Sequence, residues 1–331
     1  MNRRHFVRRA FHFSAAAALA RGAGFSAAAV AASSPDAHHL LAIGDFGSGN
    51  EKQRAVAAGM KRYVDDMRRK PGGLLLLGDN FYAKMEGGVN SARWQTGFEQ
   101  MYPATHFPGP CWAILGNHDY LDNTGGEQTQ LAYAAAHPGT RWTMPAKWYR
   151  FDFPAQNPVV TFLCLDTDLR ATIGDDVLDD GRIRNSLTAA EEAAQLEWLG
   201  KELHKPRAAH TIVLGHHPLY CDGKHKDKKP LIAYLDGLLR EHRVPLYLCG
   251  HDHDLQHIEL EDHPTSFVIS GAGGARLYDV RDKRRGPFAQ SVHGFTHLEI
   301  DERQLTIRHL DANRRLLHAF TKSAQGRVTL P

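Results

Sequence analysis

Cysteine is scarce in this sequence. The chain has four cysteines in 331 residues, and no two of them have the paired spacing of a zinc site. Three of the four lie within apolar runs, where a cysteine usually acts as a small buried hydrophobic side chain. A disulfide-stapled scaffold and a zinc ribbon are therefore excluded, and we expect no essential disulfide.

An excess of charge of one sign is also missing. The chain has 40 Lys and Arg residues and 37 Asp and Glu residues, but five of the arginines lie in residues 1–31, which contain no acid. Residues 32–331 therefore carry 35 basic and 37 acidic side chains, a balance of −2. This balance, without interleaved basic and aromatic residues, disfavours a protein that binds nucleic acid. The hydrophobic content of 42% and the charged content of 23% exclude disorder, collagen and coiled coil.

The first 31 residues have the pattern of an export signal. Arg3-Arg4 is followed by Phe6, then by a weakly apolar stretch, and then by the small residues Ala29-Val30-Ala31. The paired arginines resemble the twin-arginine type of leader, which carries folded proteins. A basic amphipathic helix or an uncleaved anchor is the alternative, but Arg21 interrupts the apolar run well short of the ~20 residues that a spanning helix needs.

Three parts of the chain follow from this pattern. We predict an export signal in residues 1–31, a short linker in residues 32–39 and one catalytic domain in residues 40–331. The protein is then periplasmic or secreted, its leader engages the export machinery, and the mature chain has no stable membrane insertion.

Five short apolar runs each end in glycine followed by a residue type that can bind metal. Continuously apolar runs bounded by glycine are typical of strands that are buried on both faces. The segments that follow the runs are Gly44-Asp45, Gly78-Asp79-Asn80, Gly116-Asn117-His118-Asp119, Gly215-His216-His217 and Gly250-His251-Asp252-His253.

Helical patterns separate these runs and predict a largely parallel α/β sheet, in which ligands gather at the carboxyl ends of the strands. The five polar segments are then expected to meet at one edge. Three helices are predicted, one capped by Asn50 and ending near Lys70, one opened by the capping box of Thr188 and ending near His204, and one from Pro230 to about His242.

The chain changes character beyond Ser266. Ser266–Ser270 is apolar, and Thr296–Ile300 and Gln304–Arg308 alternate between apolar and polar residues. Alternation of this kind predicts half-exposed antiparallel strands, which we expect to complete a second sheet. The predicted architecture is two packed sheets with helices outside.

A metal site is the chemistry that this convergence favours. Burying several carboxylates and imidazoles at one edge is costly unless a cation neutralises them. Seven donors exceed what one four-coordinate zinc ion takes, and mixed oxygen and nitrogen donors suit iron, zinc or manganese. Two metals that share a carboxylate would use them all, as in phosphatases and nucleases. The seven candidates are Asp45, Asp79, Tyr82, Asn117, His216, His251 and His253.

These segments, in this order, resemble the calcineurin-like metallophosphoesterases and, among them, the purple acid phosphatases of the small mammalian type, also called tartrate-resistant. The resemblance runs from about Leu40 to Gly274 and includes Gln195–Leu199 and Ser270–Gly273. It implies the calcineurin-like fold, two mixed sheets flanked by helices in an α/β/β/α sandwich. It also implies a ferric ion and a divalent ion, which could be iron, zinc or manganese.

The resemblance further implies a role for each candidate donor. Tyr82 is the most informative, because Ser/Thr protein phosphatases and ordinary phosphodiesterases of this superfamily lack a tyrosine three positions after the bridging aspartate. Asp45, Tyr82 and His253 would hold the ferric ion, Asp79 would bridge, and Asn117, His216 and His251 would hold the divalent ion.

Two more histidines match substrate-contacting positions of the family. His118 follows Asn117 directly, and His225 lies nine residues after His216 in a loop rich in glycine and lysine. An imidazole in such a place can protonate a leaving alcohol, for about 10²- to 10⁴-fold in rate. The predicted reaction is hydrolysis of a phosphate monoester, in which metal-bound hydroxide attacks phosphorus in line, with an acidic to near-neutral optimum.

Two other functions remain open at this point. A phosphodiesterase acting on nucleotides or phospholipid head groups would share the metals and most of the fold. A secreted iron- or metal-binding protein would also need these donors, and its phosphatase activity would be incidental.

Overall fold

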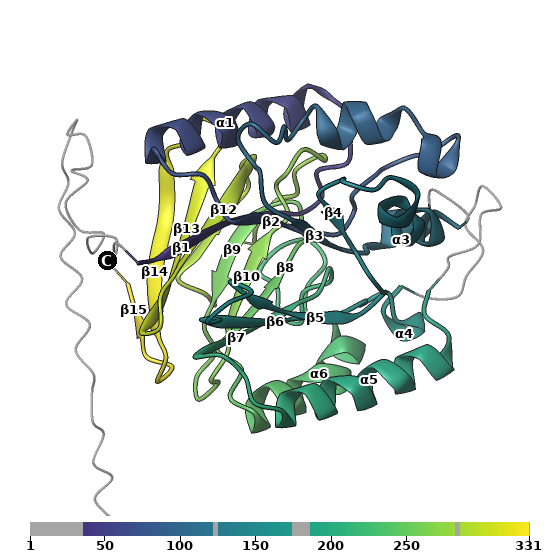
Figure 1. Ribbon diagram of the computed structural model, residues 1–331. Coiled ribbons are helices and arrows are strands. Elements are labelled where there is room, and N and C mark those ends of the chain that lie inside the picture. Colours follow the sequence, from purple (N-terminus) through teal and green to yellow (C-terminus); the bar gives the residue numbers. More distant parts are fainter. Residues whose placement is uncertain (1–35, 122–124, 174–185, 282–284, 331) are drawn as a thin grey trace, which may run out of the picture. The chain divides into compact units, whose positions relative to one another are not determined.

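The structure is a computed structural model that describes residues 36–121, 125–173, 186–281 and 285–330. The predicted leader lies outside the described residues, as does the predicted linker up to Pro35. The described residues form two β-sheets that lie face to face, with helices on their outer sides (Figure 1). This is the α/β/β/α sandwich that the family resemblance implies.

The first sheet joins a parallel half to an antiparallel half. β1 pairs in parallel with β2 and antiparallel with β12, so it lies at the junction between the two halves. In order across the sheet, the strands are β15 (Val328–Thr329), β14 (Leu316–Ser323), β13 (Gln304–Asp311), β12 (Gly294–Ile300), β1 (His38–Ile43), β2 (Gly73–Leu77), β3 (Cys111–Ile114) and β4 (Trp142–Thr143).

The second sheet has a parallel centre and antiparallel edges. β6, β7, β8 and β10 run in parallel, while β5 and β9 pair antiparallel with their neighbours. In order, its strands are β11 (Phe288–Gln290), β9 (Leu255–Ile258), β10 (Ser266–Ser270), β8 (Leu246–Cys249), β7 (His210–Leu214), β6 (Val160–Cys164) and β5 (Tyr149–Phe153).

The apolar runs are buried on both faces because each strand lies between two layers. In β7, Ile212 and Leu214 join the core between the sheets, whereas Val213 packs with the leucines of α5 and α6 on the outer side. Side chains alternate between the faces of a strand, so a strand covered on both sides needs an unbroken apolar run. The same layering covers the first sheet, where α1 packs on β12 (Figure 1).

The three predicted helices are confirmed, with ends set by the expected capping residues. Asn50 Oδ1 accepts hydrogen bonds from the amides of Lys52 and Gln53, and Thr188 with Glu191 forms a complete capping box. The helices are α1 (Glu51–Met67), α2 (Asn117–Leu121), α3 (Gly126–Ala136), α4 (Arg170–Ile173), α5 (Ala189–His204) and α6 (Lys229–Glu241), with a 3₁₀ turn at Gly88–Asn90 and a π-helical segment at Trp94–Glu99.

Two predictions about the sheets need correction. The five strands that lead to the polar segments do not share one sheet, because β1, β2 and β3 lie in the first and β7 and β8 in the second. The last strands do not all complete the second sheet, because β12 and β13 extend the first sheet through β1; β10 does join the second sheet, but it runs parallel to β8. An apolar run predicts that a strand is buried, but it does not predict which strand lies next to it in the sheet.

The expected half exposure of these last strands was also wrong. Every residue of β12 is buried, including the polar side chains of Thr296, His297 and Glu299. These polar residues are satisfied inside the protein, since Glu299 accepts a hydrogen bond from Arg308 at 2.8 Å and His297 lies 3.0 Å from His39. The alternation of apolar and polar residues in β12 therefore reflects polar side chains that pair with one another inside the protein, and not side chains that face solvent.

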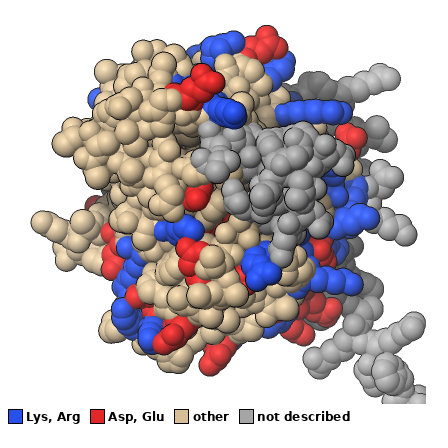
Figure 2. All heavy atoms as spheres, turned by 90° about the vertical axis from the view of Figure 1, so that its right-hand side faces the viewer, with Lys and Arg blue, Asp and Glu red and all other residues tan. Residues whose placement is uncertain are grey.

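All four cysteines are buried and free of disulfides. Within the described ranges, no helix is both long enough and apolar enough to cross a bilayer. On the face shown in Figure 2, basic and acidic side chains are interspersed.

Candidate metal centre

The carboxyl ends of strands from both sheets supply the polar side chains of the site. Asp45 follows β1, Asp79 follows β2, Asn117 follows β3, His216 follows β7 and His251 follows β8. Asp45, Asp79 and His251 have positive φ angles of 56°, 50° and 68°, a region that side chains other than glycine rarely adopt. Strained backbone at three donors is typical of a functional site.

Glycines in the polar segments let these donors approach one another. A Cβ on Gly78, whose φ is +86°, would lie 2.5 Å from His216 Nδ1. A Cβ on Gly116 would lie 2.5 Å from Asp79 Oδ1, and one on Gly250 would lie 2.5 Å from Asp45 Oδ2. Glycine is therefore required at these turns because a donor occupies the space of its side chain.

One group of donors surrounds Asp45. His253 Nε2 lies 3.3 Å from Asp45 Oδ1, and the Tyr82 hydroxyl lies 3.4 Å from the same oxygen and 3.3 Å from His253 Nε2. Single donor atoms of Asp45, Asp79 and His253 all lie within 4.8 Å of one another. His253 is held from behind, because its Nδ1 lies 2.6 Å from the Arg276 carbonyl and its ring stacks on Tyr278 at 4.1 Å.

A second group surrounds His216 and His251. The Nδ1 of His216 lies 2.8 Å from the Leu77 carbonyl, and that of His251 lies 3.0 Å from Asn117 Oδ1. The Nε2 atoms of both rings are buried without a hydrogen-bond partner. His216 Nε2 lies 3.4 Å from Asp79 Oδ1, so Asp79 stands between the two groups.

The charges of the site are strongly coupled. Burial alone would raise the pKa of Asp79, but His216 and His118 lower it below its ordinary value. Burial opposes the charged form of His216, whereas Asp79 and Asp45 raise its pKa to about 10. Burial, followed by the carboxylates of Asp79 and Asp45, raises the pKa of Tyr82 well above its usual range. A cation in this pocket would supply the positive charge that the carboxylates require.

These residues fit a metal centre. Buried carboxylates combine with two unpartnered imidazole nitrogens, and the other nitrogen of each ring is held by a protein oxygen. This is how metal-binding histidines are usually fixed in orientation. The donor set of oxygens and imidazoles suits iron, zinc or manganese.

The two predicted substrate histidines lie on opposite sides of the donors. The ring of His118 is 4.6 Å from that of Tyr82, and its amide donates a 2.9 Å hydrogen bond to Asp79 Oδ1. The ring of His225 is 4.2 Å from that of His251, and its Nδ1 lies 3.4 Å from Asp252 Oδ1. All nine predicted site residues are therefore brought to one region.

Asp119 and Asp252 hold segments of the site together. Asp119 is fully buried and accepts hydrogen bonds from the amides of Gly116, Asn80 and Phe81, which joins the turns after β2 and β3. Asp252 accepts hydrogen bonds from the amides of Lys224 and His225, and so ties the lysine-rich loop to the segment of His251. Cys221 Sγ also contacts Asp252, which gives this cysteine a place in the same network.

The sequence prediction missed Thr167 and Tyr278. Thr167 Oγ1 accepts hydrogen bonds from the amides of His216 and His217 and lies 3.0 Å from His217 Nδ1. Thr167 comes after β6, a strand whose apolar run has no glycine at its end, so the signal used for the other five strands is absent. Tyr278 lies in a segment without regular structure, and no pattern singles it out.

The chain belongs to the calcineurin-like phosphoesterase family, because the sequence model of this family matches residues 38–255. Members of this family are hydrolases. Mouse tartrate-resistant acid phosphatase type 5 is 31% identical over 293 residues, covering 83% of this chain and 86% of the relative. Purple acid phosphatase 7 of Arabidopsis thaliana is 29% identical, covering 87% and 86% of the two chains. The predicted family is thus confirmed, and its metallophosphoesterase relatives imply a binuclear metal centre.

Solved structures share the fold at low identity. Purple acid phosphatase PPD1 from yellow lupin has a TM-score of 0.63 at 17% identity, covering 87% of this chain and 54% of its own. The protein GAP50, described as the anchor in the inner membrane complex of Plasmodium, has a TM-score of 0.67 at 21% identity, covering 86% and 87% of the two chains. The calcineurin-like fold is confirmed by this likeness.

Proposed function

We propose that the protein is an exported acid phosphatase that hydrolyses phosphate monoesters with two metal ions. The observation that carries the proposal is that the buried Nε2 atoms of His216 and His251 have no hydrogen-bond partner, while that of His216 lies 3.4 Å from the carboxylate of Asp79. Asp45, Tyr82 and His253 would hold one ion, Asp79 would bridge, and Asn117, His216 and His251 would hold the other.

The two metal ions, when bound, would supply Lewis acidity toward the phosphate oxygens and an activated water for in-line attack on phosphorus. Side chains of the protein would orient the substrate and supply a proton to the leaving group. His118, beside Tyr82, and His225, beside His251, lie where one imidazole can orient the phosphate and the other can protonate the departing alcohol. Asp252 positions His225 for this role through the loop amides.

Tyr82 favours a ferric ion at the position that it shares with Asp45 and His253. A phenolate is a hard anionic donor, and the raised pKa of Tyr82 means that only a highly charged cation would deprotonate it near neutral pH. The second ion is divalent, with iron, zinc or manganese as candidates. A trivalent ion makes water more acidic than a divalent one does, so we expect an acidic to near-neutral optimum.

Metal analysis and a visible spectrum of protein purified without added metal test the metal assignment. We expect two ions per chain, at least one of them iron, and a tyrosinate-to-iron band that Tyr82→Phe abolishes. Tyr278→Phe is the matched control, because Tyr278 stacks on His253 without being a proposed donor, and it should keep the band. Full activity with zinc or manganese alone, without a visible band, would contradict the ferric assignment.

Rates on p-nitrophenyl phosphate and on bis(p-nitrophenyl) phosphate test the substrate class. We expect the monoester to be hydrolysed faster under the same conditions. A preference for the diester would instead identify a phosphodiesterase on the same fold.

We further propose that residues 1–31 are a twin-arginine export signal and that the chain after a short linker forms one catalytic domain in the periplasm or outside the cell. The predicted linker of residues 32–39 is too long, because β1 begins at His38, and His38 and His39 pair with β12. The pattern of Arg3-Arg4 with Phe6 supports the export signal. Replacing both arginines by lysine should retain active protein in the cytoplasm, as measured by activity in cell fractions. Unchanged export of the double variant would count against a twin-arginine signal.

A further inference from the structure

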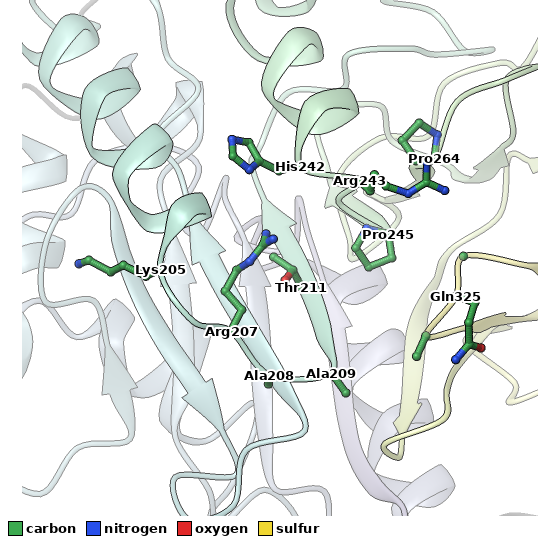
Figure 3. Close-up of a pocket in the computed structure, with 12 residues that line it drawn as sticks. Lys205, Arg207, Ala208, Ala209, Thr211, His242, Arg243, Pro245, Pro264 and Gln325 are labelled. Carbon is green, nitrogen blue, oxygen red and sulfur yellow. The ribbon is translucent and has the colours of Figure 1, made fainter.

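A second polar pocket lies at the opposite end of the strands that carry the metal donors. It has a volume of about 460 Å³ and is lined at the amino end of β7 by Ala209 and Thr211, and before β8 by Arg243 and Pro245 (Figure 3). His216 follows the other end of β7, seven residues after Ala209. At about 3.3 Å per residue, the pocket is roughly 20 Å from the candidate metal centre.

The pocket is basic. Arg207, Arg243, Lys205 and His242 line it, and no acidic side chain is among its described lining residues. Lys205 is already neutralised, because its Nζ lies 2.6 Å from Glu202, and it points away from the other lining residues in Figure 3. The charges of Arg207 and Arg243 are therefore the ones available to a ligand. Arg207 is half-buried, whereas Arg243 is exposed and extends toward Pro264 in Figure 3, so the two arginines line different parts of the pocket.

Neither of these two guanidinium groups has an ion-pair partner in the part of the chain that the structure describes. Arg207 Nη1 and His242 Nε2 are both buried, and neither atom has a hydrogen-bond partner among the described residues. The side chain of Arg207 extends toward His242 in Figure 3, so these two unpartnered nitrogens belong to the same part of the pocket. A buried donor without an acceptor is destabilising, and more so when it is charged.

The surroundings of Arg207 add to this cost. Burial and then the positive charge of Arg150 lower the pKa of Arg207. An anion in the pocket would accept from the unpartnered nitrogens and offset the like charges. Guanidinium groups match the geometry of oxyanions, to which they donate two parallel hydrogen bonds.

We propose that this pocket is a second anion site, separate from the metal centre, which binds a phosphate-type oxyanion through Arg207 and Arg243. The oxyanion is either free phosphate or the charged group of a small organic molecule. The volume falls in the usual range of small-molecule sites, and Pro245 and Pro264 provide an apolar wall for an organic part. The inference does not depend on the proposed reaction.

A cation is the competing occupant. Donor atoms of His204, Glu241 and His242 lie within 4.8 Å of one another, and His204 Nδ1 lies 2.7 Å from the Gly200 carbonyl, which leaves its Nε2 available. However, Arg207 and Arg243 would repel a cation bound beside them, so the charge of the pocket favours the anion.

Equilibrium dialysis of the metal-loaded protein with radiolabelled inorganic phosphate tests the proposal. We expect two phosphate ions per wild-type chain, one of them at the metal centre. Arg207→Gln/Arg243→Gln should weaken one of the two sites at least tenfold and leave activity toward p-nitrophenyl phosphate unchanged. Arg62→Gln/Arg303→Gln is the matched control, because it removes the same charge from two exposed arginines outside the pocket and should still bind two.

Phenylphosphonate, which cannot be hydrolysed at its carbon–phosphorus bond, distinguishes the two kinds of ligand. Tighter binding of phenylphosphonate than of phosphate at the arginine-dependent site identifies an organic ligand, and equal or weaker binding identifies free phosphate. Phosphate binding that Arg207→Gln/Arg243→Gln leaves unchanged, or equal losses in both double variants, would overturn the proposal. A third metal ion that His204→Gln removes, with phosphate binding unchanged by Arg207→Gln/Arg243→Gln, would show that the pocket holds a cation instead.

Discussion

Two groups of buried histidines in this molecule differ in how their ring nitrogens are satisfied. In the group at β9, β13 and β14, His257 lies 2.9 Å from His318 and 2.6 Å from Glu259, and His309 lies 2.9 Å from Thr296 and 3.1 Å from the Gln256 carbonyl. Both nitrogens of His257 and of His309 therefore have partners within the protein.

Two histidines of the candidate metal centre, His216 and His251, have a hydrogen-bond partner at only one ring nitrogen. One nitrogen of His216 and one of His251 contact protein oxygens, while the other nitrogen of each ring is buried and unpartnered. Burial and clustering are thus the same in both groups. The two buried nitrogens without a hydrogen-bond partner, one of them 3.4 Å from the Asp79 carboxylate, distinguish a candidate site for an ion from a structural cluster.

We expect the largest effect from replacing the carboxylate beside the histidines of the candidate metal centre, compared with replacing the carboxylate in the other histidine group. Asp79→Asn should lower kcat/KM for p-nitrophenyl phosphate by at least about 10³-fold and reduce the metal content, because a metal ion contributes several kcal/mol to such reactions. Glu259→Gln is the control, since Glu259 contacts His257 in the other group. It should lower the midpoint of thermal unfolding and leave the metal content unchanged. If both variants keep their metals and activity, the distinction between the two groups fails.

His118→Ala should reduce kcat by about 10²-fold or more, because the proposed proton donor is lost. The metal content should be unchanged, since His118 is not a proposed donor. Metal analysis of the same preparation separates the two effects. A variant that loses metal together with activity would show that His118 supports the ions and does not act on the substrate.

His309→Ala should destabilise the protein by about 2 kcal/mol, because it leaves the Thr296 hydroxyl and the Gln256 carbonyl without their partner. Urea unfolding at neutral pH measures this change. Activity and metal content well below the unfolding midpoint should equal those of the wild type. A loss of metal in this variant would contradict the structural role of the second group.

The last expected effect is a dependence of stability on pH. Burial and then the neighbouring His318 lower the pKa of His309 to about 3, and burial and then His257 lower that of His318 to about 4. The unfolded chain takes up these protons near pH 6.5, whereas the folded chain does not until pH 4 or below. Stability should therefore fall as the pH decreases from about 6.5 to 4, by at most about 1.4 kcal/mol per pH unit for each histidine.

Urea unfolding at pH 7 and at pH 4.5 measures this dependence. His309→Gln should be less stable than the wild type at pH 7 but should lose less stability between the two values. An equal loss in both proteins would show that other groups control the acid sensitivity.

The sequence was sufficient to identify candidate donors that the fold brings together, but not to predict which sheet carries each of them. The residues after β1, β2, β3, β7 and β8 were found because a buried strand that ends in glycine leaves a local pattern. The pairing of β1 with β12 depends on residues about 260 positions apart, and nothing in either strand specifies the other. Thr167 and Arg207 were missed for the same reason, since their importance comes from groups that only the fold brings near.

The division of the donors between two sheets has a consequence for assembly. Asp45, Asp79 and Asn117 belong to one sheet, and His216, His251 and His253 follow strands of the other. An ion bound by donors from both sheets would link the two layers, so neither sheet alone would retain it. Loading then reports that the whole domain has formed, and removal of the ions should loosen the two layers from each other before either one unravels.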